Sequence, residues 1–299
     1  MRAPRFSDLA DEGDPWEALA GYSAAAEMPC RLAFHQALRD VTAARGRALK
    51  TGGDECAFAV LGMGKLGGRE LNASSDIDIV YIFESEDGET EGGAPLTEWA
   101  ADLAWRIGEL LGTHGAGLRV DLRLRPGGQY GPLAASLASA EAHYEYFGQA
   151  WERQMLVRAR AIAGSGALGE AFIDTLRPFV YRRRMDPAAL AEIRRVKRRI
   201  DAEVAVAAGG DENVKLSRGG IRELEYVVQT YQLLYGGRLP NCARRRCARR
   251  STFSNKTNCS RWRTFARSAR RTSSCAGWRT AFSFRTAGKI TACPRRTDP

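Results

Sequence analysis

The stretch that decides the fold runs from residue 62 to residue 82 and reads Gly-Met-Gly-Lys-Leu-Gly-Gly-Arg-Glu-Leu-Asn-Ala-Ser-Ser-Asp-Ile-Asp-Ile-Val-Tyr-Ile. It opens with a glycine-rich turn and closes with a β-branched run that predicts a strand. Asp76 and Asp78 lie two residues apart where the two parts meet. Side chains two residues apart on a strand share a face. Two carboxylates on one face offer the oxygen ligands that hard divalent cations prefer, so this end of the strand predicts a metal site.

The glycines upstream predict a phosphate contact. Gly67 and Gly68 have no Cβ, so the backbone can approach a phosphate group closely there. Beside Asp76 and Asp78, this feature supports the hypothesis of metal-dependent nucleotidyl or phosphoryl transfer.

The length of 299 residues allows one large or two ordinary domains with a sizeable core. The N-terminus lacks the apolar segment of a signal peptide, and no apolar run approaches the ~18 residues that span a bilayer. We therefore expect a cytoplasmic protein with no membrane partner.

The net charge of +10 would ordinarily suggest a nucleic-acid partner. However, residues 241–299 hold 16 of the 45 Lys and Arg and a single acid, Asp298. That segment has a formal charge of +15 and the residues before it −5. The body of the chain is mildly acidic, and we expect no nucleic-acid partner for it.

Cysteine usage argues against zinc binding and against a disulfide scaffold. Of the seven cysteines only Cys30 and Cys56 precede residue 240, and no C-x-x-C pair occurs. An odd number of cysteines in a chain without a signal peptide also disfavours structural disulfides.

Periodicity gives a coarse series of elements. In chain order we expect helical structure over 16–49, a strand over 56–61, a short helix around Glu70, a strand over 77–83, an acidic loop over 84–95 and a helix over 96–111. Helical periodicity dominates residues 136–240, where one helix is expected to begin after Gly219-Gly220.

A second informative stretch is residues 119–126, Arg-Val-Asp-Leu-Arg-Leu-Arg-Pro. Its alternation predicts a strand with apolar residues on one face and Asp121, Arg123 and Arg125 on the other, ended by Pro126. An alternating charged strand can simply be a solvated face. If the strand pairs beside the one that carries Asp76 and Asp78, Asp121 supplies a third carboxylate and the arginines meet phosphate oxygens.

Together these segments resemble the glutamine-synthetase adenylyltransferase family, in the DNA polymerase β-like nucleotidyltransferase superfamily. The resemblance covers about residues 50–240 and rests on five ordered motifs: Gly62-x-Gly-Lys-Leu-Gly-Gly-x-Glu-Leu71 followed by Ser-Asp-Ile-Asp78, Val120-Asp-Leu-Arg-Leu-Arg-Pro126, Trp151-Glu-Arg153, Phe179-Val-Tyr-Arg-Arg183, and Lys215-Leu216 with Gly219-Gly-Ile-Arg-Glu-Leu-Glu-Tyr226.

The resemblance implies a function and partners. The full-length enzyme of that family has two homologous halves: one attaches AMP to a tyrosine of glutamine synthetase, and the other removes it by phosphorolysis, releasing ADP, to control nitrogen assimilation. The motif sequences of this chain resemble those of the N-terminal, adenylyl-removing half; the second half is absent from it. The implied partners are glutamine synthetase, ATP or ADP, orthophosphate and a PII-type nitrogen regulatory protein.

The resemblance also implies the site residues. Asp76, Asp78 and Asp121 would hold two Mg²⁺ ions and be the catalytic residues. The phosphate and nucleotide would be bound by Lys65, Gly67, Gly68, Ser75, Arg123 and Arg125.

The expected fold class is α+β, a small mixed sheet with helices of the polymerase-β-like kind, flanked by helical segments. The expected divisions are an N-terminal helical segment (1–50), a nucleotidyltransferase domain (51–135), an incomplete helical domain (136–240) and a disordered basic tail (241–299).

The tail has two interpretations. Residues 241–299 contain no Leu and no Val, so they cannot bury enough apolar surface to fold. Their arginines and aromatic residues could form a nucleic-acid-binding tail. We favour a frameshifted gene, because codons for residues 284–294 permit, in a neighbouring frame, Leu-Gln-Asp-Gly-Arg-Gln-Asp-His-Arg-Leu-Pro, which resembles the family's continuation.

Two alternatives to AMP removal stay open. One is adenylylation of glutamine synthetase with ATP, which uses the same metal chemistry. The other is a truncated remnant without turnover that binds nucleotide or glutamine synthetase.

Overall fold

The computed structural model describes residues 15–72, 75–112, 115–182 and 221–238, with four isolated positions at 191, 195, 198 and 202. The chain divides into two compact units, one of residues 1–184 with 232–246 and the other of residues 185–231 with 247–299. The first unit carries the sheet and every predicted site residue. The helix α9, Ile221–Tyr235, begins as expected after Gly219-Gly220. Its residues 221–231 belong to the second unit and its residues 232–235 to the first.

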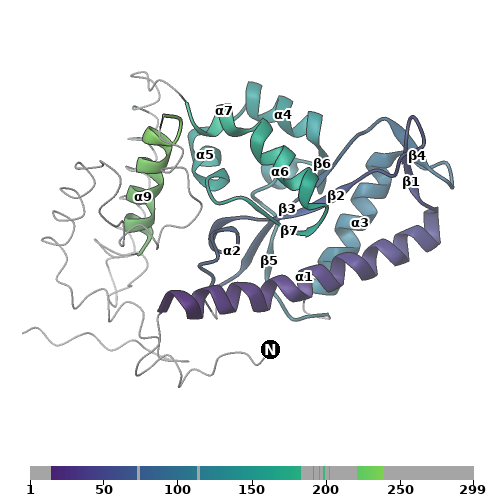
Figure 1. The fold of residues 1–299 in the computed structure, drawn as a ribbon, viewed down its shortest axis with the longest axis horizontal. Coiled ribbons are helices and arrows are strands. Elements are labelled where there is room, and N and C mark those ends of the chain that lie inside the picture. The colour runs from purple at the N-terminus through teal and green to yellow at the C-terminus, as the bar shows by residue number, and fades with distance from the viewer. Residues whose placement is uncertain are drawn as a thin grey trace, which may run out of the picture. The chain divides into compact units, whose positions relative to one another are not determined.

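The first unit is built on a mixed sheet around β3 (Figure 1). Its strands are β2 Phe58–Gly62, β3 Ile77–Phe83, β5 Val120–Asp121, β6 Ala134–Ser136 and β7 Arg160–Gly164. The strand β2 runs antiparallel to both β3 and β7, whereas β5 and β6 run parallel to β3 along its other edge. A separate two-stranded ribbon joins β1 Ala48–Lys50 to β4 Gly88–Thr90.

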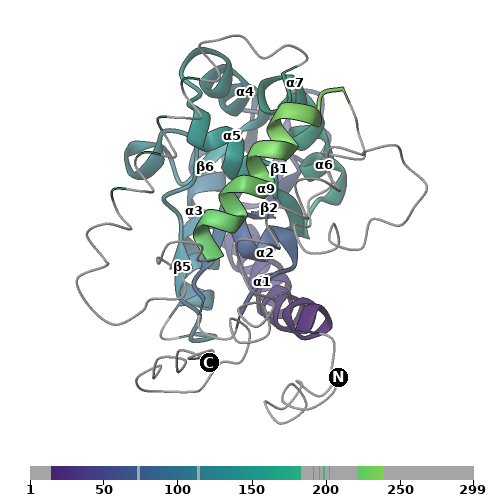
Figure 2. The same cartoon turned by 90° about the vertical axis from the view of Figure 1, so that its left-hand side faces the viewer.

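Helices cover both faces of this sheet (Figure 1, Figure 2). The first unit's α-helices are α1 Pro15–Arg45, α2 Gly64–Gly68, α3 Leu96–Leu111, α4 Leu137–Tyr146, α5 Ala150–Leu156, α6 Gly166–Thr175 and α7 Arg177–Val180, and a 3-10 turn, η2, spans Gly128–Tyr130. The helices α1 and α3 lie on one face, and α4 to α7 lie on the other.

The alternation of β3 divides the core into two halves. Ile77, Ile79 and Tyr81 pack with α1 and α3. Val80 and Ile82 pack with the helices of the opposite face. Both faces of the strand are therefore buried, and Asp78 belongs by its register to the face of Val80 and Ile82.

Several expected elements are confirmed. The helix over 96–111 begins and ends where the apolar spacing predicts, with Leu96, Trp99, Leu103 and Ile107 buried. The strand over 77–83 is also confirmed. The mixed sheet with flanking helices confirms the α+β class.

Four local expectations are wrong. Residues 136–240 are not helical throughout, because β7 pairs with β2 within the sheet, and the helical structure expected over 16–49 ends at Arg45, before β1. The helix predicted around Glu70 lies earlier, as α2, because Arg69 adopts a left-handed conformation (φ 58°) that ends it. The loop over 84–95 contains β4, whose three residues Gly-Glu-Thr carry no apolar alternation that could have revealed a strand.

Other expectations fall outside what the structure describes. They include the tail over 241–299, the motif over 215–220 and most of the helical structure expected over 183–214. The domain divisions at residues 50, 135 and 240 stay predictions, although α1 packs on α3 and β7 within the sheet's own unit.

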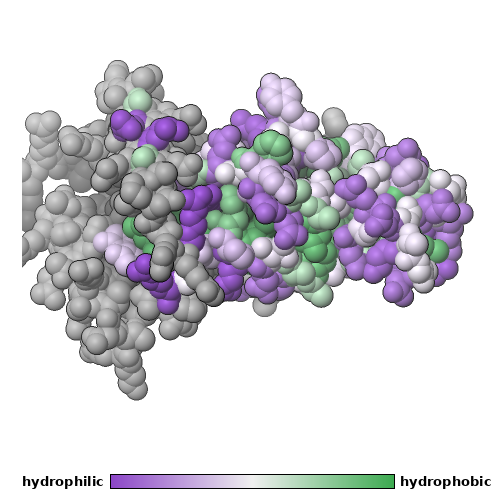
Figure 3. All heavy atoms as spheres, turned by 90° about the horizontal axis from the view of Figure 1, so that it is seen from above, coloured by the Kyte–Doolittle hydropathy of each residue, from purple (hydrophilic) through white to green (hydrophobic). Residues whose placement is uncertain are grey.

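The surface of the described residues mixes hydrophilic and hydrophobic side chains, with a hydrophobic area bordered by hydrophilic residues in the view from above (Figure 3). Among the described residues no helix combines the length and apolar character needed to cross a bilayer.

Two tryptophans of α3 give a matched test of the core. Trp99 is 2% exposed and Trp105 is 58% exposed. We expect Trp99→Ala to lower the free energy of unfolding by about 3–5 kcal/mol and Trp105→Ala by less than about 1 kcal/mol, because only the first leaves a cavity. Urea denaturation of the two variants measures this, and equal losses would contradict the packing described.

Candidate functional site

Three carboxylates gather where β5 joins the sheet. Asp76 lies directly before β3, and Asp78 is the second residue of that strand. The parallel register of β3 with β5 sets Ile77 beside Val120 and Asp78 beside Asp121. The expected pairing of the second stretch beside the first is therefore confirmed, and it makes Asp78 and Asp121 cross-strand neighbours.

Asp78 is the electrostatic centre of this group. Burial, together with the negative charges of Asp121 and Asp76, raises the pKa of its carboxyl to about 6. Lys65 and Arg123 act in the opposite direction without offsetting these effects. A buried carboxyl among like charges is typical of a group that needs a cation to stay ionised.

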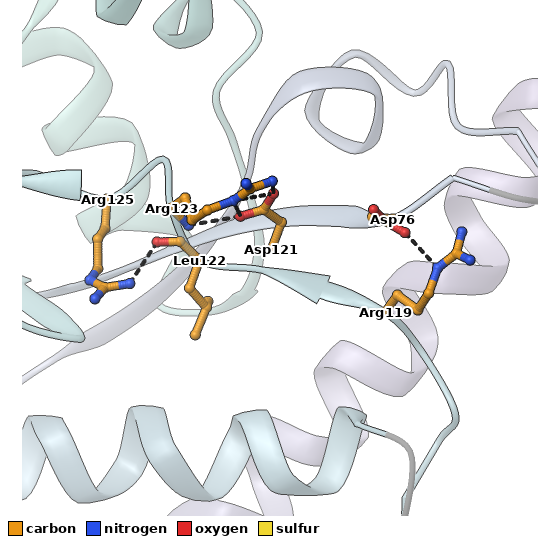
Figure 4. Close-up of polar contacts among 6 residues, drawn as sticks. All are labelled: Asp76, Arg119, Asp121, Leu122, Arg123 and Arg125. Carbon is orange, nitrogen blue, oxygen red and sulfur yellow. Dashed lines mark hydrogen bonds and ion pairs between the residues drawn. The ribbon is translucent and has the colours of Figure 1, made fainter. Parts of the chain in front are cut away.

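The two outer carboxylates each contact an arginine (Figure 4). The Nε of Arg119 donates to Oδ1 of Asp76 at 2.6 Å. The Nη2 of Arg123 lies 2.5 Å from Oδ2 of Asp121, and its Nε is 3.0 Å from Oδ1. Hydrogen bonding by Arg123 lowers the pKa of Asp121, so that carboxyl is ionised at neutral pH.

The glycine turn forms the short helix α2 beside Asp78. Gly64 has φ +48°, and a Cβ there would lie 2.6 Å from Oδ2 of Asp78. A Cβ on Gly67 would lie 2.1 Å from the carbonyl oxygen of Arg158. Gly67 and Gly68 are both buried. The glycine that faces the carboxylate is therefore Gly64, and Gly67 permits close backbone packing; a phosphate contact by Gly67 and Gly68 stays a prediction.

Lys65 and Ser75 meet at one amide side chain. The Nζ of Lys65 donates to Oδ1 of Asn72 at 3.3 Å, and the hydroxyl of Ser75 hydrogen-bonds the same oxygen. Asn72 thus connects α2 to the segment that leads into Asp76.

Arg125 does not share a strand face with Asp121 and Arg123. The strand predicted over 119–126 ends after Asp121, and the chain then turns. The guanidinium of Arg125 donates to the carbonyl oxygens of Leu122, Gln129 and Gly131 at 2.9–3.0 Å. These three hydrogen bonds stabilise a loop after Asp121, so the expectation of a continuous alternating strand is wrong. A phosphate contact by Arg125 stays a prediction.

Two further arginines contact α2 or the residues that follow it. Arg158 is 2% exposed and pairs with Glu70 at 3.6 Å. Arg160, opposite Gly62 across β2 and β7, donates to the carbonyl oxygens of Leu66 and Gly67 at 3.0 Å and pairs with Glu27. No sequence signal assigned these residues to the site.

Arg119 and Gly64 were also not among the predicted site residues. Arg119 continues the two-residue spacing of Asp121 and Arg123, so the alternation could have revealed it. For Gly64, no pattern distinguishes which glycine of the turn faces a carboxylate.

The chemistry of the three carboxylates fits a divalent cation. Within the described ranges no three His, Cys, Asp or Glu side chains converge so as to hold a metal ion. Asp76 and Asp121 are instead turned toward arginines. The backbone register and the space left by Gly64 beside Asp78 nevertheless bring three oxygen donors to one end of the sheet.

Asp78→Asn should stabilise the protein without divalent cations. The folded-state pKa of about 6 lies above the ordinary 3.8, so the folded chain binds more protons between these values and loses stability as pH rises from about 4 to 6. At pH 7.5 in EDTA we expect a gain of about 1–3 kcal/mol in urea denaturation.

The matched control is Asp102→Asn, a half-exposed carboxylate on α3 that pairs with Arg45; its loss should lower stability by less than about 1 kcal/mol. An Asp78→Asn protein that is less stable than wild type, or that keeps the wild-type decline between pH 4 and 6, would contradict the assignment.

Gly64→Ala tests the close approach to Asp78. Gly93 also has positive φ (+80°), but a Cβ there meets nothing within 4 Å. Gly93→Ala should therefore cost only the backbone strain, about 1–2 kcal/mol, whereas Gly64→Ala must also displace the carboxylate and should weaken Mg²⁺ binding. Calorimetric Mg²⁺ titration of both variants measures this; equal Mg²⁺ affinities would contradict the contact.

Comparison with known proteins gives consistent matches. Residues 6–175 match the family model of glutamate-ammonia ligase adenylyltransferase, and residues 191–272 match that of GlnD PII-uridylyltransferase, which continues past residue 240.

Curated relatives share the name bifunctional glutamine synthetase adenylyltransferase/adenylyl-removing enzyme. The chain is 42% identical to that of Stenotrophomonas maltophilia strain R551-3 over 246 residues, 81% of this chain and 26% of the relative. It is 44% identical to that of Hahella chejuensis over 207 residues, 67% of this chain and 21% of the relative. The chain thus spans about a quarter of the length of these relatives. Because the first family model covers more than half of its residues, the chain belongs to the glutamate-ammonia ligase adenylyltransferase family.

Proposed function

We propose that this chain carries the site that removes AMP from an adenylylated tyrosine of glutamine synthetase by phosphorolysis, releasing ADP. The observation that carries the proposal is the register of β3 with β5, which brings Asp78 and Asp121 together beside Asp76. The relatives' printed name includes an adenylyl-removing activity. The residues of the motif around the glycine turn resemble those of the family's adenylyl-removing half.

In this proposal Asp76, Asp78 and Asp121 hold Mg²⁺, two ions when substrate is bound. Bound Mg²⁺ would stabilise negative charge that develops on the phosphoryl oxygens. An orthophosphate oxygen forms a bond to the α-phosphorus of adenylyl-tyrosine, the bond to the tyrosyl oxygen breaks, and that oxygen takes up a proton.

The chain's own residues contribute position and charge. Lys65 and Arg123 bring positive charge to the site and oppose the repulsion around Asp78. The network of Arg158 and Arg160 fixes α2, so Gly64 and Lys65 keep their places beside the carboxylates. Positioning and electrostatics supply most of the rate gain in phosphoryl transfer, and a covalent nucleophile is not needed.

The regulatory partner is a PII-type protein in this proposal, and the enzyme acts in the cytoplasm. Support comes from the match of residues 191–272 to a PII-uridylyltransferase. Through a PII-type protein, nitrogen status would control both the addition and the removal of AMP.

Adenylylation of glutamine synthetase with ATP is the second candidate, because the relatives' name includes an adenylyltransferase activity. Both directions use the same carboxylates. The third candidate is binding of nucleotide or glutamine synthetase without turnover.

One assay separates these candidates. Adenylylated glutamine synthetase, orthophosphate and Mg²⁺ are incubated with the 299-residue chain, and ADP is measured; unmodified glutamine synthetase with labelled ATP is the reverse assay. We expect ADP release that falls about 10²–10³-fold in Asp121→Asn and stays unchanged in Asp102→Asn.

AMP incorporation without ADP release would establish the second candidate. Absence of both activities, with nucleotide or glutamine synthetase still bound, would establish the third. Full activity in Asp121→Asn would overturn the assignment of the carboxylates.

A further inference from the structure

Arg119 is fixed beside Asp76 by the backbone. Its carbonyl oxygen accepts a hydrogen bond from the amide of Ile77 at 2.9 Å, directly before the paired positions Ile77 and Val120. The side chain then reaches Asp76, with Nε 2.6 Å from Oδ1 (Figure 4). The strand pairing therefore sets the Cα of Arg119, and the guanidinium can move only within a side chain's length of the carboxylates.

The ion pair between Arg119 and Asp76 is solvent-exposed. The side chain of Arg119 is 72% exposed and that of Asp76 54%. Exposed pairs of this kind are weak, because water screens them and both side chains lose freedom. A divalent cation that takes the oxygens of Asp76 would displace the guanidinium easily.

A displaced Arg119 would still lie at the site. The planar fork of N–H groups of its guanidinium can donate to two oxygens of a phosphate group at once. A single carboxylate oxygen uses only part of this donor capacity. Arg123 has the corresponding arrangement on Asp121, with the side chain 76% exposed. One exposed arginine thus stands on each outer carboxylate of the site.

We infer that Arg119 shields Asp76 until a divalent cation binds and then becomes a ligand of the substrate's phosphate group. This inference rests on the proposed function and adds to it a phosphate-binding residue. Cation binding and phosphate binding are then linked, because the cation releases the cationic group that the phosphate needs.

The test uses the 299-residue chain, Mn²⁺ as the metal probe and inorganic phosphate as the anion probe, at low ionic strength. Free Mn²⁺ is measured by electron paramagnetic resonance, and phosphate binding by calorimetry at saturating Mn²⁺. In Arg119→Gln we expect Mn²⁺ alone to bind about two- to fivefold tighter. Phosphate should bind about tenfold weaker.

Two further variants control for net charge and for the fork. Arg47→Gln removes an arginine that is 57% exposed and paired with Glu91, beside the ribbon strand β1, and should change neither affinity. Arg119→Lys keeps the charge but not the planar fork, so it should restore Mn²⁺ affinity to the wild-type value and phosphate affinity only in part.

The outcomes separate this inference from the proposed function. If wild type binds Mn²⁺ and Arg119→Gln shows unchanged affinities for both probes, the inference is wrong and the metal site stands. Weaker Mn²⁺ binding in Arg119→Gln would also overturn it. If wild type does not bind Mn²⁺, the metal site fails, and the inference fails with it.

Discussion

The parallel pairing of β5 with β3 is the constraint on which the site depends. It sets Asp121 directly beside Asp78, although 43 positions of sequence separate the two. Two carboxylates on adjacent strands repel each other, and burial increases the cost for Asp78. The protein maintains this unfavourable arrangement because β3 is held on both faces by apolar residues. Arg119 and Arg123 reduce the repulsion at the outer carboxylates.

The surrounding fold explains how such repulsion is tolerated. Ile79 and Tyr81 pack against α1 and α3, while Val80 and Ile82 pack against the opposite helices. Burial of each such side chain stabilises the fold by about 1.5–3 kcal/mol. A few of them therefore outweigh the free-energy cost of ionising Asp78, whose pKa is raised to about 6. On the other side of the turn, Arg158 and Arg160 hold α2 through Glu70 and backbone carbonyls. Gly64 is thereby kept against Asp78 at a distance that no other residue type permits.

The sequence predicted the elements with strong periodicity and the residues with a distinctive chemistry. The helix over 96–111 and the strand over 77–83 are confirmed because their apolar spacing is regular and both are long. The pairing that gives Asp121 its place was predicted from alternation and from the family's motifs. The turn after Asp121 was missed, because contacts of Arg125 with carbonyl groups as far as Gly131 decide it. The positions of Gly64, Arg158 and Arg160 likewise follow from tertiary contacts that no local pattern records.

The central claim is that Asp76, Asp78 and Asp121 form one electrostatically coupled cation site. The most direct measurement is a titration of the aspartate carboxyl carbons by ¹³C NMR, with and without saturating Mg²⁺. We expect one carboxyl that titrates near pH 6 without metal, is lost in Asp78→Asn, and no longer titrates above pH 5 once Mg²⁺ binds. A full set of aspartates that titrates below about pH 4.5 without metal, or an Asp78 signal that Mg²⁺ leaves unchanged, would contradict it.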